Sequence, residues 1–379
     1  MPTTTYEFDA LRGVGQVELC VQKDQRVYAL FGSNGVGKTK CLEALFQFYL
    51  LGCKPFMVHH RAQLSKSIFV ARSYSSDALS IIVFDNNPSQ VFQVTPQSGV
   101  VGAEYHSLPV VFLGASQRGH IKNKPSASSP IGTFEERREN YFTSLVAGMD
   151  KGFSSLGMHA DVEQWFVTLA QSASPYQKQT DNRKIEIETL LQLLHQVDER
   201  FDPSFMEVAG NNRVSLKVQG QVTELQHLSS GFASLLKILQ AIISGYANFT
   251  NELNLTRVRG LVFIDEIESH LHVKWQSSIV VLLKKLFPNT TFFIATHSPI
   301  VLSQLHGGEA YLLKRGDDGV VRSQPIENPD KRILADVLAE VLDVNLNRLK
   351  VERMTPESQK DAKAQLLDLL NAGGGVPDA

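Results

Sequence analysis

The glycine-rich segment over residues 32–39 constrains the fold of this chain more than any other feature. It follows the pattern G-x-x-x-x-G-K-[ST] and consists of Gly32, Ser33, Asn34, Gly35, Val36, Gly37, Lys38 and Thr39. An apolar run over 27–31 precedes it, and apolar residues at helical spacing follow it from Leu42 to Tyr49. This arrangement predicts a buried strand, a phosphate-binding loop and a helix. The alternative is a glycine-rich turn that only caps a helix, and the strand in front of the loop disfavours it.

The residue types of this loop suit a nucleotide bound with a metal ion. Its glycines let main-chain N–H groups turn towards a β-phosphate, and the Lys38 ammonium reaches the β- and γ-phosphates. The Thr39 hydroxyl is placed to bind Mg²⁺. We therefore expect a nucleotide and Mg²⁺ as the ligands of this loop.

A second apolar run ends in two carboxylates. Residues 261–264 are apolar, and Asp265 and Glu266 follow them directly. We expect Asp265 to hold the magnesium ion, directly or through water, and Glu266 to polarise the water that attacks the γ-phosphate. The alternative is a strand that merely ends in an acidic turn, which is less consistent with a phosphate loop in the same chain.

Composition places the chain among ordinary globular proteins and limits its partners. Its 379 residues, 43% hydrophobic and 20% charged, suffice for one large α/β domain or two lobes. A net charge of −2 provides no general attraction to nucleic acid or anionic lipid, so any such contact must be local. Three unpatterned cysteines, a polar start and no apolar run of membrane-spanning length favour a cytoplasmic protein without membrane contact.

Apolar patterning predicts the remaining elements. We expect strands over 15–21, 26–31, 67–72, 79–84, 90–94 and 108–115, of which the three from 67 to 94 form an antiparallel layer. A loop over 119–132 and a mostly helical segment over 134–202 follow, without a sustained heptad pattern. Further strands are predicted over 205–208 and 214–218.

The segment Leu228-Ser229-Ser230-Gly231-Phe232 precedes an apolar helical stripe. Ser229 and Gly231 therefore fall at a helix N-terminus, where free N–H groups and the helix dipole favour an anion. Placed upstream of the Asp-Glu pair, the segment resembles the signature motif of the ATP-binding-cassette (ABC) ATPases. The resemblance implies that ATP is the nucleotide and that the signature of one subunit closes on the γ-phosphate held by another. Ser230 and Phe232 depart from the usual glycine and glutamine, which weakens the analogy to transporters more than the predicted fold.

Three further segments match the same family in order. His297, after the apolar strand over 291–295, is similar to the family's switch histidine, which contacts the γ-phosphate. Gln117, after the strand over 108–115, is positioned like the family's magnesium- and water-contacting glutamine. Residues 269–272 lie where the family has its dimer-contact loop. That loop includes His270 and His272, which lack a third metal ligand in register.

A small basic run lies beside the predicted site. It consists of Arg118, His120, Lys122 and Lys124. Its simplest interpretation is a solvated loop, and the alternative is a contact with nucleic acid or with an effector protein.

Residues from about 15 to 305 resemble the cassette pattern, and the segments over 264–272 and 296–299 are similar to its soluble OLD-family, SMC and RecF-like branch. Many members of that branch are ATPase subunits of anti-phage systems of the Septu and PARIS type. The resemblance implies an α/β ABC-ATPase head with a mixed central sheet, an antiparallel β layer and a helical lobe inserted between Gln117 and the signature. We therefore divide the chain into an N-terminal ATPase lobe (1–117), the helical lobe (118–227), a C-terminal ATPase lobe (228–305) and a C-terminal segment (306–379).

The C-terminal segment is expected to hold a strand over 310–314 and helices over 330–342 and 356–370. Some members of the branch carry a Toprim nuclease domain after the ATPase. The C-terminal segment is too short, and has too few clustered acidic residues, to be such a domain. The resemblance therefore favours a dimeric or larger ATPase that controls a separate effector, a nuclease, in anti-phage defence. A DNA-binding repair or chromosome-maintenance ATPase is the second hypothesis, and DNA-stimulated turnover would favour it. The nucleotide-binding subunit of a transporter is the third, and the long span between Gln117 and Leu228 argues against it.

Overall fold

The computed structural model describes residues 2–61, 64–84, 91–96, 105–121, 130–158 and 161–331. They belong to one compact unit that spans residues 1–331, and residues 332–379 form a second unit outside the described residues. The predicted helix over 356–370 and nearly all of the helix over 330–342 therefore lie outside the described residues.

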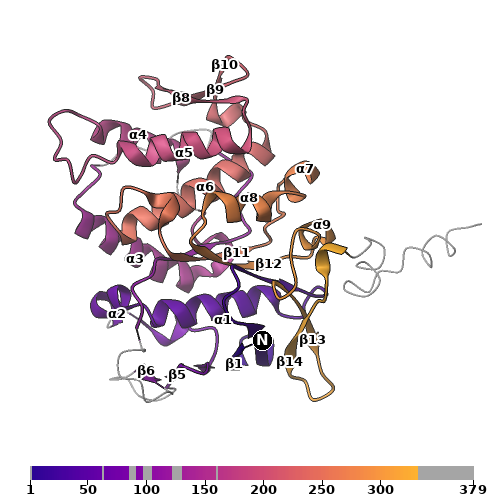
Figure 1. Ribbon diagram of the computed structural model, residues 1–379. Helices are drawn as coiled ribbons and strands as arrows, with labels where there is room; N and C mark the ends of the chain where they lie inside the picture. The colour runs from indigo at the N-terminus through magenta and orange to yellow at the C-terminus, as the bar shows by residue number, and fades with distance from the viewer. Residues whose placement is uncertain are drawn as a thin grey trace, which may run out of the picture. The chain divides into compact units, whose positions relative to one another are not determined.

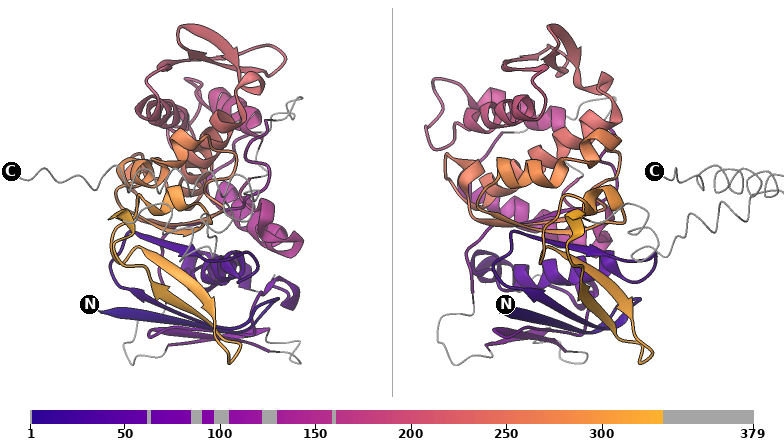
Figure 2. Two further views of the ribbon diagram at one scale, coloured as in Figure 1. Left: turned by 90° about the vertical axis from the view of Figure 1, so that its right-hand side faces the viewer. Right: turned by 45° about the vertical axis from the view of Figure 1, so that its right-hand side comes forward.

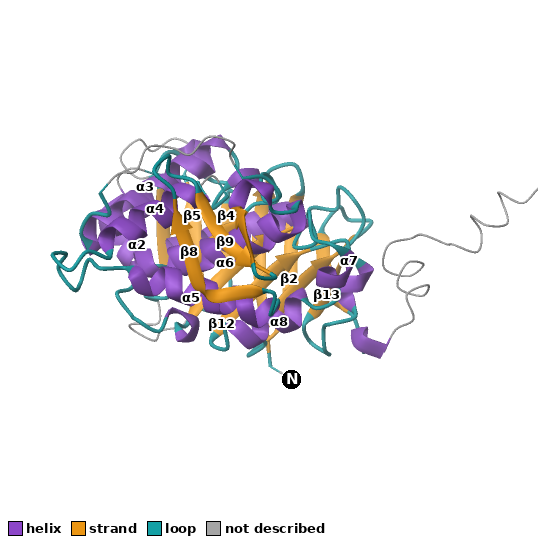
Figure 3. Ribbon diagram, turned by 90° about the horizontal axis from the view of Figure 1, so that it is seen from above, coloured by secondary structure: helices purple, strands orange, loops and turns teal. Residues whose placement is uncertain are grey.

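The described residues form a large mixed sheet with the strand order β6-β5-β4-β1-β2-β14-β13-β3-β12-β11-β7 (Figures 1 and 3). Its strands are β1 (Thr3–Leu11), β2 (Gly15–Gln22), β3 (Val27–Phe31), β4 (Ser73–Ser75), β5 (Leu79–Val83), β6 (Phe92–Pro96), β7 (Val110–Leu113), β11 (Gly260–Asp265), β12 (Thr290–Ala295), β13 (Ala310–Arg315) and β14 (Val321–Pro325). Strands β13, β3, β12, β11 and β7 run parallel to one another, and β3, β11 and β7 are buried along their whole length. Burial on both faces explains why these strands are continuous apolar runs in the sequence.

Helix α1 (Lys38–Leu51) lies between the parallel and antiparallel parts of the sheet. It contacts β7, β11 and β12 on one side and β1 and β4 on the other, and Figure 2 shows it enclosed between them. Ten of the fourteen residues of α1 are buried, from Cys41 onward all except Tyr49, so its apolar residues surround this part of the helix rather than forming one stripe.

Most of the other helices lie on the side of the parallel strands that faces away from α1, whereas α2 lies beside α1 (Figure 1). They are α2 (Lys54–His60), α3 (Phe134–Lys151), α4 (Val162–Ser172), α5 (Lys184–Val197), α6 (Ser230–Phe249), α7 (Val273–Gln276), α8 (Ile279–Leu286) and α9 (Pro299–Leu302). A small antiparallel sheet of β8 (Phe201–Val208), β9 (Val214–Val218) and β10 (Gln221–Glu224) contacts α4 and α5.

Among the described residues, α6 is the one helix that is long and apolar enough, by length and composition alone, to cross a membrane. Most of α6 is buried inside the fold, where it contacts α3, α5 and β7. Its composition is thus that of a core helix.

The predicted fold class is confirmed: the chain is an α/β protein with a mixed sheet, an antiparallel layer and helices between Gln117 and the signature segment. The strand predicted over 67–72 is wrong, because a turn of 3-10 helix occupies 66–68 and the strand begins at Ser73. The N–H groups of Val70 and Ala71 donate to the Tyr74 hydroxyl instead of to a neighbouring strand. The apolar residues of this segment are buried without forming a strand, so an apolar run alone was not enough to place the strand.

Candidate nucleotide site

The glycine-rich loop, the Asp-Glu pair and His297 meet at one edge of the sheet. They follow β3, β11 and β12, which are parallel neighbours, so their carboxyl ends share that edge. A hollow of about 550 Å³ lies there. It is lined by Arg12, Gly13, Val14, Asn34, Gly35, Gly37, Lys38, Thr39, Lys40, Asp265, Glu266, Ala295, Thr296 and His297. The sequence-predicted residues of three separate segments thus surround a single space.

Two glycines of the loop leave no room for a side chain. Gly37 has a φ of 111°, and a Cβ atom there would lie 2.9 Å from both methyl groups of Val14. A Cβ atom on Gly32 would lie 2.9 Å from Val36 Cγ1 and 3.0 Å from the main-chain oxygen of Leu313. The loop can therefore curl this tightly only with glycine at both positions.

Lys38 lies folded over the loop. Its Nζ donates to the main-chain oxygens of Gly32 at 2.8 Å and Ser33 at 3.1 Å. Burial lowers the pKa of Lys38, and the carboxylates of Glu268, Asp265 and Glu266 oppose that effect. An anion inside the loop would meet this ammonium directly.

Thr39 and Asp265 fit a magnesium ion. The Thr39 hydroxyl donates to Asp265 Oδ1 at 2.9 Å, and burial raises the pKa of Asp265. Two neighbouring ligands of an octahedral Mg²⁺ ion, each at about 2.1 Å, lie about 2.9 Å apart. The two oxygens are therefore already at the spacing that one ion requires.

Glu266 follows β11 in a strained conformation, with a φ of 44°. Its Oε2 accepts a hydrogen bond from the Ser269 hydroxyl at 3.0 Å, which fixes the carboxylate beside the hollow. The sequence predicted Glu266 for this place but did not single out Ser269.

Glu268 is a residue of the site that the sequence analysis missed. It is buried, and its carboxylate accepts hydrogen bonds from the Thr296 hydroxyl at 2.6 Å and the His297 main-chain N–H at 2.9 Å. Its Oε1 also lies 3.0 Å from His297 Nδ1. The sequence feature that could have indicated it is a third carboxylate, Glu268, within three residues of Asp265.

Arg118 corrects the interpretation of the basic run as a solvated loop. It is fully buried, and its guanidinium donates to the main-chain oxygens of Leu113, Asp265 and Glu266. Burial lowers its pKa to about 10, while the nearby carboxylates of Asp265, Glu268 and Glu266 oppose that effect. Arg118 therefore joins the ends of β7 and β11 and is not available to nucleic acid. Lys122 and Lys124 lie outside the described residues.

Replacing Arg118 by methionine is expected to lower the free energy of unfolding by about 3 kcal/mol, because three carbonyl groups lose their donor and each costs about 1 kcal/mol or more. Urea unfolding measures the change. Arg322→Met is the matched control, because the Arg322 side chain is 43% exposed and its ion pairs with Glu18 and Asp318 lie at the surface. Equal, small effects of the two substitutions would contradict the bridging role of Arg118.

Gln117 lies at the site's margin. Its side chain is exposed, it does not line the phosphate-loop hollow, and its φ is 68°. Its main-chain oxygen accepts a hydrogen bond from Lys237 Nζ of α6 at 2.6 Å. Its expected contact with magnesium stays a prediction.

The signature residues line a different hollow, of about 470 Å³. Ser229 caps α6, with its hydroxyl accepting from the Phe232 N–H at 3.4 Å, and Gly231 packs against Trp275, whose ring a Cβ atom would approach to 2.9 Å. His270 and Lys274 also line this hollow, and no residue of the phosphate loop does. Within one chain, the signature and the phosphate loop therefore face separate spaces.

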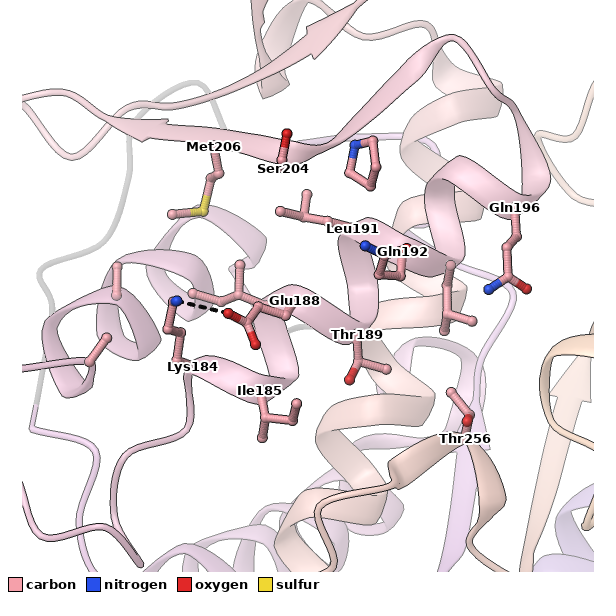
Figure 4. A pocket seen from close by; sticks show the side chains of 15 residues that line it. Lys184, Ile185, Glu188, Thr189, Leu191, Gln192, Gln196, Ser204, Met206 and Thr256 are labelled. Atoms are coloured by element: carbon pink, nitrogen blue, oxygen red, sulfur yellow. Dashed lines mark ion pairs between the residues drawn. The ribbon is translucent and has the colours of Figure 1, made fainter.

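A larger hollow of about 810 Å³ lies between α5 and β8, and its single drawn ion pair joins Lys184 and Glu188 at 2.8 Å (Figure 4). Both side chains of that pair are largely exposed. No cluster of three or more His, Cys, Asp or Glu side chains that could hold a metal ion occurs among the described residues.

Comparison with known proteins gives one family and several sequence relatives. Residues 174–303 match the family AAA_21, described as "AAA domain, putative AbiEii toxin, Type IV TA system". The chain is 33% identical over 121 residues to the retron Vc95 probable ATPase of Vibrio cholerae, covering 32% of this chain and 24% of that protein. It is 24% identical over 331 residues to the Septu protein PtuA of Bacillus mycoides, covering 83% of this chain and 40% of that protein. The chain thus spans well under half the length of these relatives.

Solved structures similar to this one include SMC head domains. One is the SMC head bound to the C-winged helix domain of ScpA, with a TM-score of 0.46, 13% identity and coverage of 86% of this chain and 98% of that chain. Another is the SMC head domain from Thermotoga maritima, with a TM-score of 0.41, 14% identity and coverage of 86% and 100%.

The family model covers the signature, the Asp-Glu strand and His297, and it begins after the phosphate loop. The loop is therefore a separate observation, made from the sequence and from the geometry around Lys38 and Thr39. The loop and the matches together make the chain similar to ATPases of the AAA_21 type over residues 174–303 and to the Septu and retron proteins named above.

Proposed function

We propose that the chain binds and hydrolyses ATP as a dimer and thereby controls a separate effector protein, a nuclease, in bacterial anti-phage defence in the cytoplasm. The observation that carries the ATPase part is the convergence of Lys38, Thr39, Asp265, Glu266 and His297 on one hollow. The relatives named as a Septu protein and as a retron ATPase support the defence role.

In this proposal, the chain's own residues divide the work on ATP. Lys38 and the loop N–H groups hold the β- and γ-phosphates, and Glu266 orients and polarises the attacking water. His297 contacts the γ-phosphate from the end of β12. A magnesium ion held by Thr39 and Asp265, with Gln117 at its margin, would neutralise charge on the phosphate oxygens.

The separate hollows support a shared site. Ser229 and Gly231 lie at the N-terminus of the twenty-residue helix α6, where an anion is favoured, yet they do not line their own chain's phosphate hollow. A second copy would bring its γ-phosphate to them. ATP would then hold two subunits together, and hydrolysis would release them.

The dimer is tested by measuring ATP turnover per subunit over a wide range of protein concentrations. If the site is shared, turnover per subunit should fall when the protein concentration is lowered below the dissociation constant of the dimer. If DNA raises turnover severalfold while no separately encoded nuclease associates with the chain, the repair-type hypothesis replaces the defence hypothesis.

Replacing Lys38 by alanine is expected to weaken ATP binding, because it removes the ammonium that faces the β- and γ-phosphates. ATP-driven dimerisation should weaken with it. Isothermal calorimetry measures the affinity. Lys23→Ala is the matched control, since Lys23 pairs with Asp77 at the surface and does not line the phosphate-loop hollow, so its loss should leave the affinity unchanged. Unchanged affinity in Lys38→Ala would contradict the placement of the loop.

A further inference from the structure

Glu268 lies between the end of β11 and the end of β12. It follows Glu266 by two residues, and it is buried although it carries a carboxyl group. Buried carboxylates are costly unless their oxygens accept hydrogen bonds. The hydrogen bonds described for the Glu268 carboxylate all come from Thr296 and His297, so the segment that carries His297 meets this cost.

The contacts determine which nitrogen of His297 faces the hollow. Glu268 Oε1 accepts the main-chain N–H of His297 and Oε2 accepts the Thr296 hydroxyl, so both oxygens act as acceptors. The 3.0 Å contact to Nδ1 then requires a proton on Nδ1. Since the carboxylate occupies Nδ1, Nε2 is the ring nitrogen left for a ligand, and the half-exposed His297 side chain lines the phosphate hollow.

We propose that Glu268 is a positioning residue for hydrolysis, which fixes the tautomer and orientation of His297 so that Nε2 meets the γ-phosphate. This inference rests on the proposed contact between His297 and the γ-phosphate. A phosphate oxygen only accepts hydrogen bonds, so Nε2 must donate and the ring must carry both protons in that contact. The Glu268 carboxylate balances the resulting positive charge, as carboxylates do behind histidines at other reactive sites.

The position of Glu268 also links two roles. Glu266 and Glu268 belong to one short turn, in which the Ser269 N–H donates to the Glu266 main-chain oxygen at 2.9 Å. The group that orients water and the group that orients His297 are therefore held by the same few residues. A shift of this turn would misplace both at once.

The first test is the tautomer itself, read without ATP. In protein labelled with ¹⁵N-histidine, the two-bond proton–nitrogen pattern reports which ring nitrogen is protonated, and the His297→Ala variant identifies the His297 signals. We expect a protonated Nδ1 in the wild type and loss of that pattern in Glu268→Ala. If Glu268→Ala is not recovered folded, Glu268→Leu keeps the volume without an acceptor. An unchanged His297 pattern in the folded variant would overturn the inference.

The second test is a double-mutant cycle on ATP turnover. Glu268→Ala is expected to lower kcat by about 10- to 100-fold with little change in KM, the range for groups that orient a contacting ligand. The same substitution in a His297→Ala background should lower kcat almost no further, because Glu268 acts through the imidazole. Thr296→Val is the control: it removes one donor to Glu268, leaves the pair with Nδ1 in place and should cost much less.

The outcomes separate this inference from the proposed function. If His297→Ala turns over ATP at the wild-type rate, the proposed contact with the γ-phosphate fails. If His297→Ala is slow but Glu268→Ala retains full activity, or if their effects multiply, the γ-phosphate contact stands and Glu268 is not its positioning residue.

Discussion

Replacing Glu266 by glutamine is expected to lower the rate of ATP hydrolysis by roughly 10²–10⁴-fold while ATP binding persists. Glutamine keeps the size of the side chain and can still accept the hydrogen bond that Ser269 donates at 3.0 Å. It removes the negative charge that polarises water. The loop groups that hold phosphate, Lys38 and Thr39, stay in place. The dimer should consequently become longer-lived, because its ATP is no longer consumed.

Three measurements check this prediction: phosphate release for the rate, calorimetry for ATP affinity, and sedimentation for the lifetime of the dimer. Glu135→Gln, at the exposed start of α3, is the matched control and should change none of them. The hydrolysis rate of Ser269→Ala should lie between those of Glu266→Gln and Glu135→Gln, because this substitution removes the hydrogen bond that fixes the Glu266 carboxylate but leaves its charge. Hydrolysis by Glu266→Gln at the wild-type rate would show that another group activates the water.

Two inactive variants are expected to restore activity when mixed. Lys38→Ala lacks a working phosphate loop but keeps its signature, and Ser229→Arg keeps the loop but fills the signature hollow. Because the loop and the signature line separate hollows in one chain, a mixed dimer would contain one intact composite site. Its activity should reach up to about half that of the wild-type dimer if the sites are independent.

Phosphate release from equimolar mixtures, titrated over total protein concentration, measures this rescue. The control is a chain that carries both substitutions, mixed with either single variant, because those mixtures contain no intact composite site. Ser229→Arg alone should bind ATP yet remain monomeric. Failure of every mixture, combined with wild-type turnover that does not depend on concentration, would exclude a site shared between subunits.

The sequence predicted the parts of the site that short motifs determine. Lys38, Thr39 and Asp265 lie where their strand, loop and helix contexts placed them, since parallel strands bring their carboxyl ends together. Their roles in binding and catalysis remain predictions.

Arg118 and Glu268 could not be placed in the same way. The Arg118 guanidinium reaches carbonyl groups almost 150 residues further along the chain, and no local pattern distinguishes such an arginine from a solvated one. Likewise, β1 was not predicted because its outward face is polar and only Tyr6, Phe8 and Leu11 are buried. Long-range pairing, not propensity, determines these features.

The enclosure of α1 has a thermodynamic consequence. This helix begins at Lys38, directly after the phosphate loop, and contacts both halves of the large sheet. Its loss would expose the core on two sides, so the loop and the surrounding fold should unfold in one cooperative step. Nucleotide that binds only the folded loop would then stabilise the whole unit, by about 1.4 kcal/mol for each tenfold rise in free ligand above its dissociation constant. Cellular ATP would thereby act as a folding ligand and set the lifetime of the chain against proteolysis.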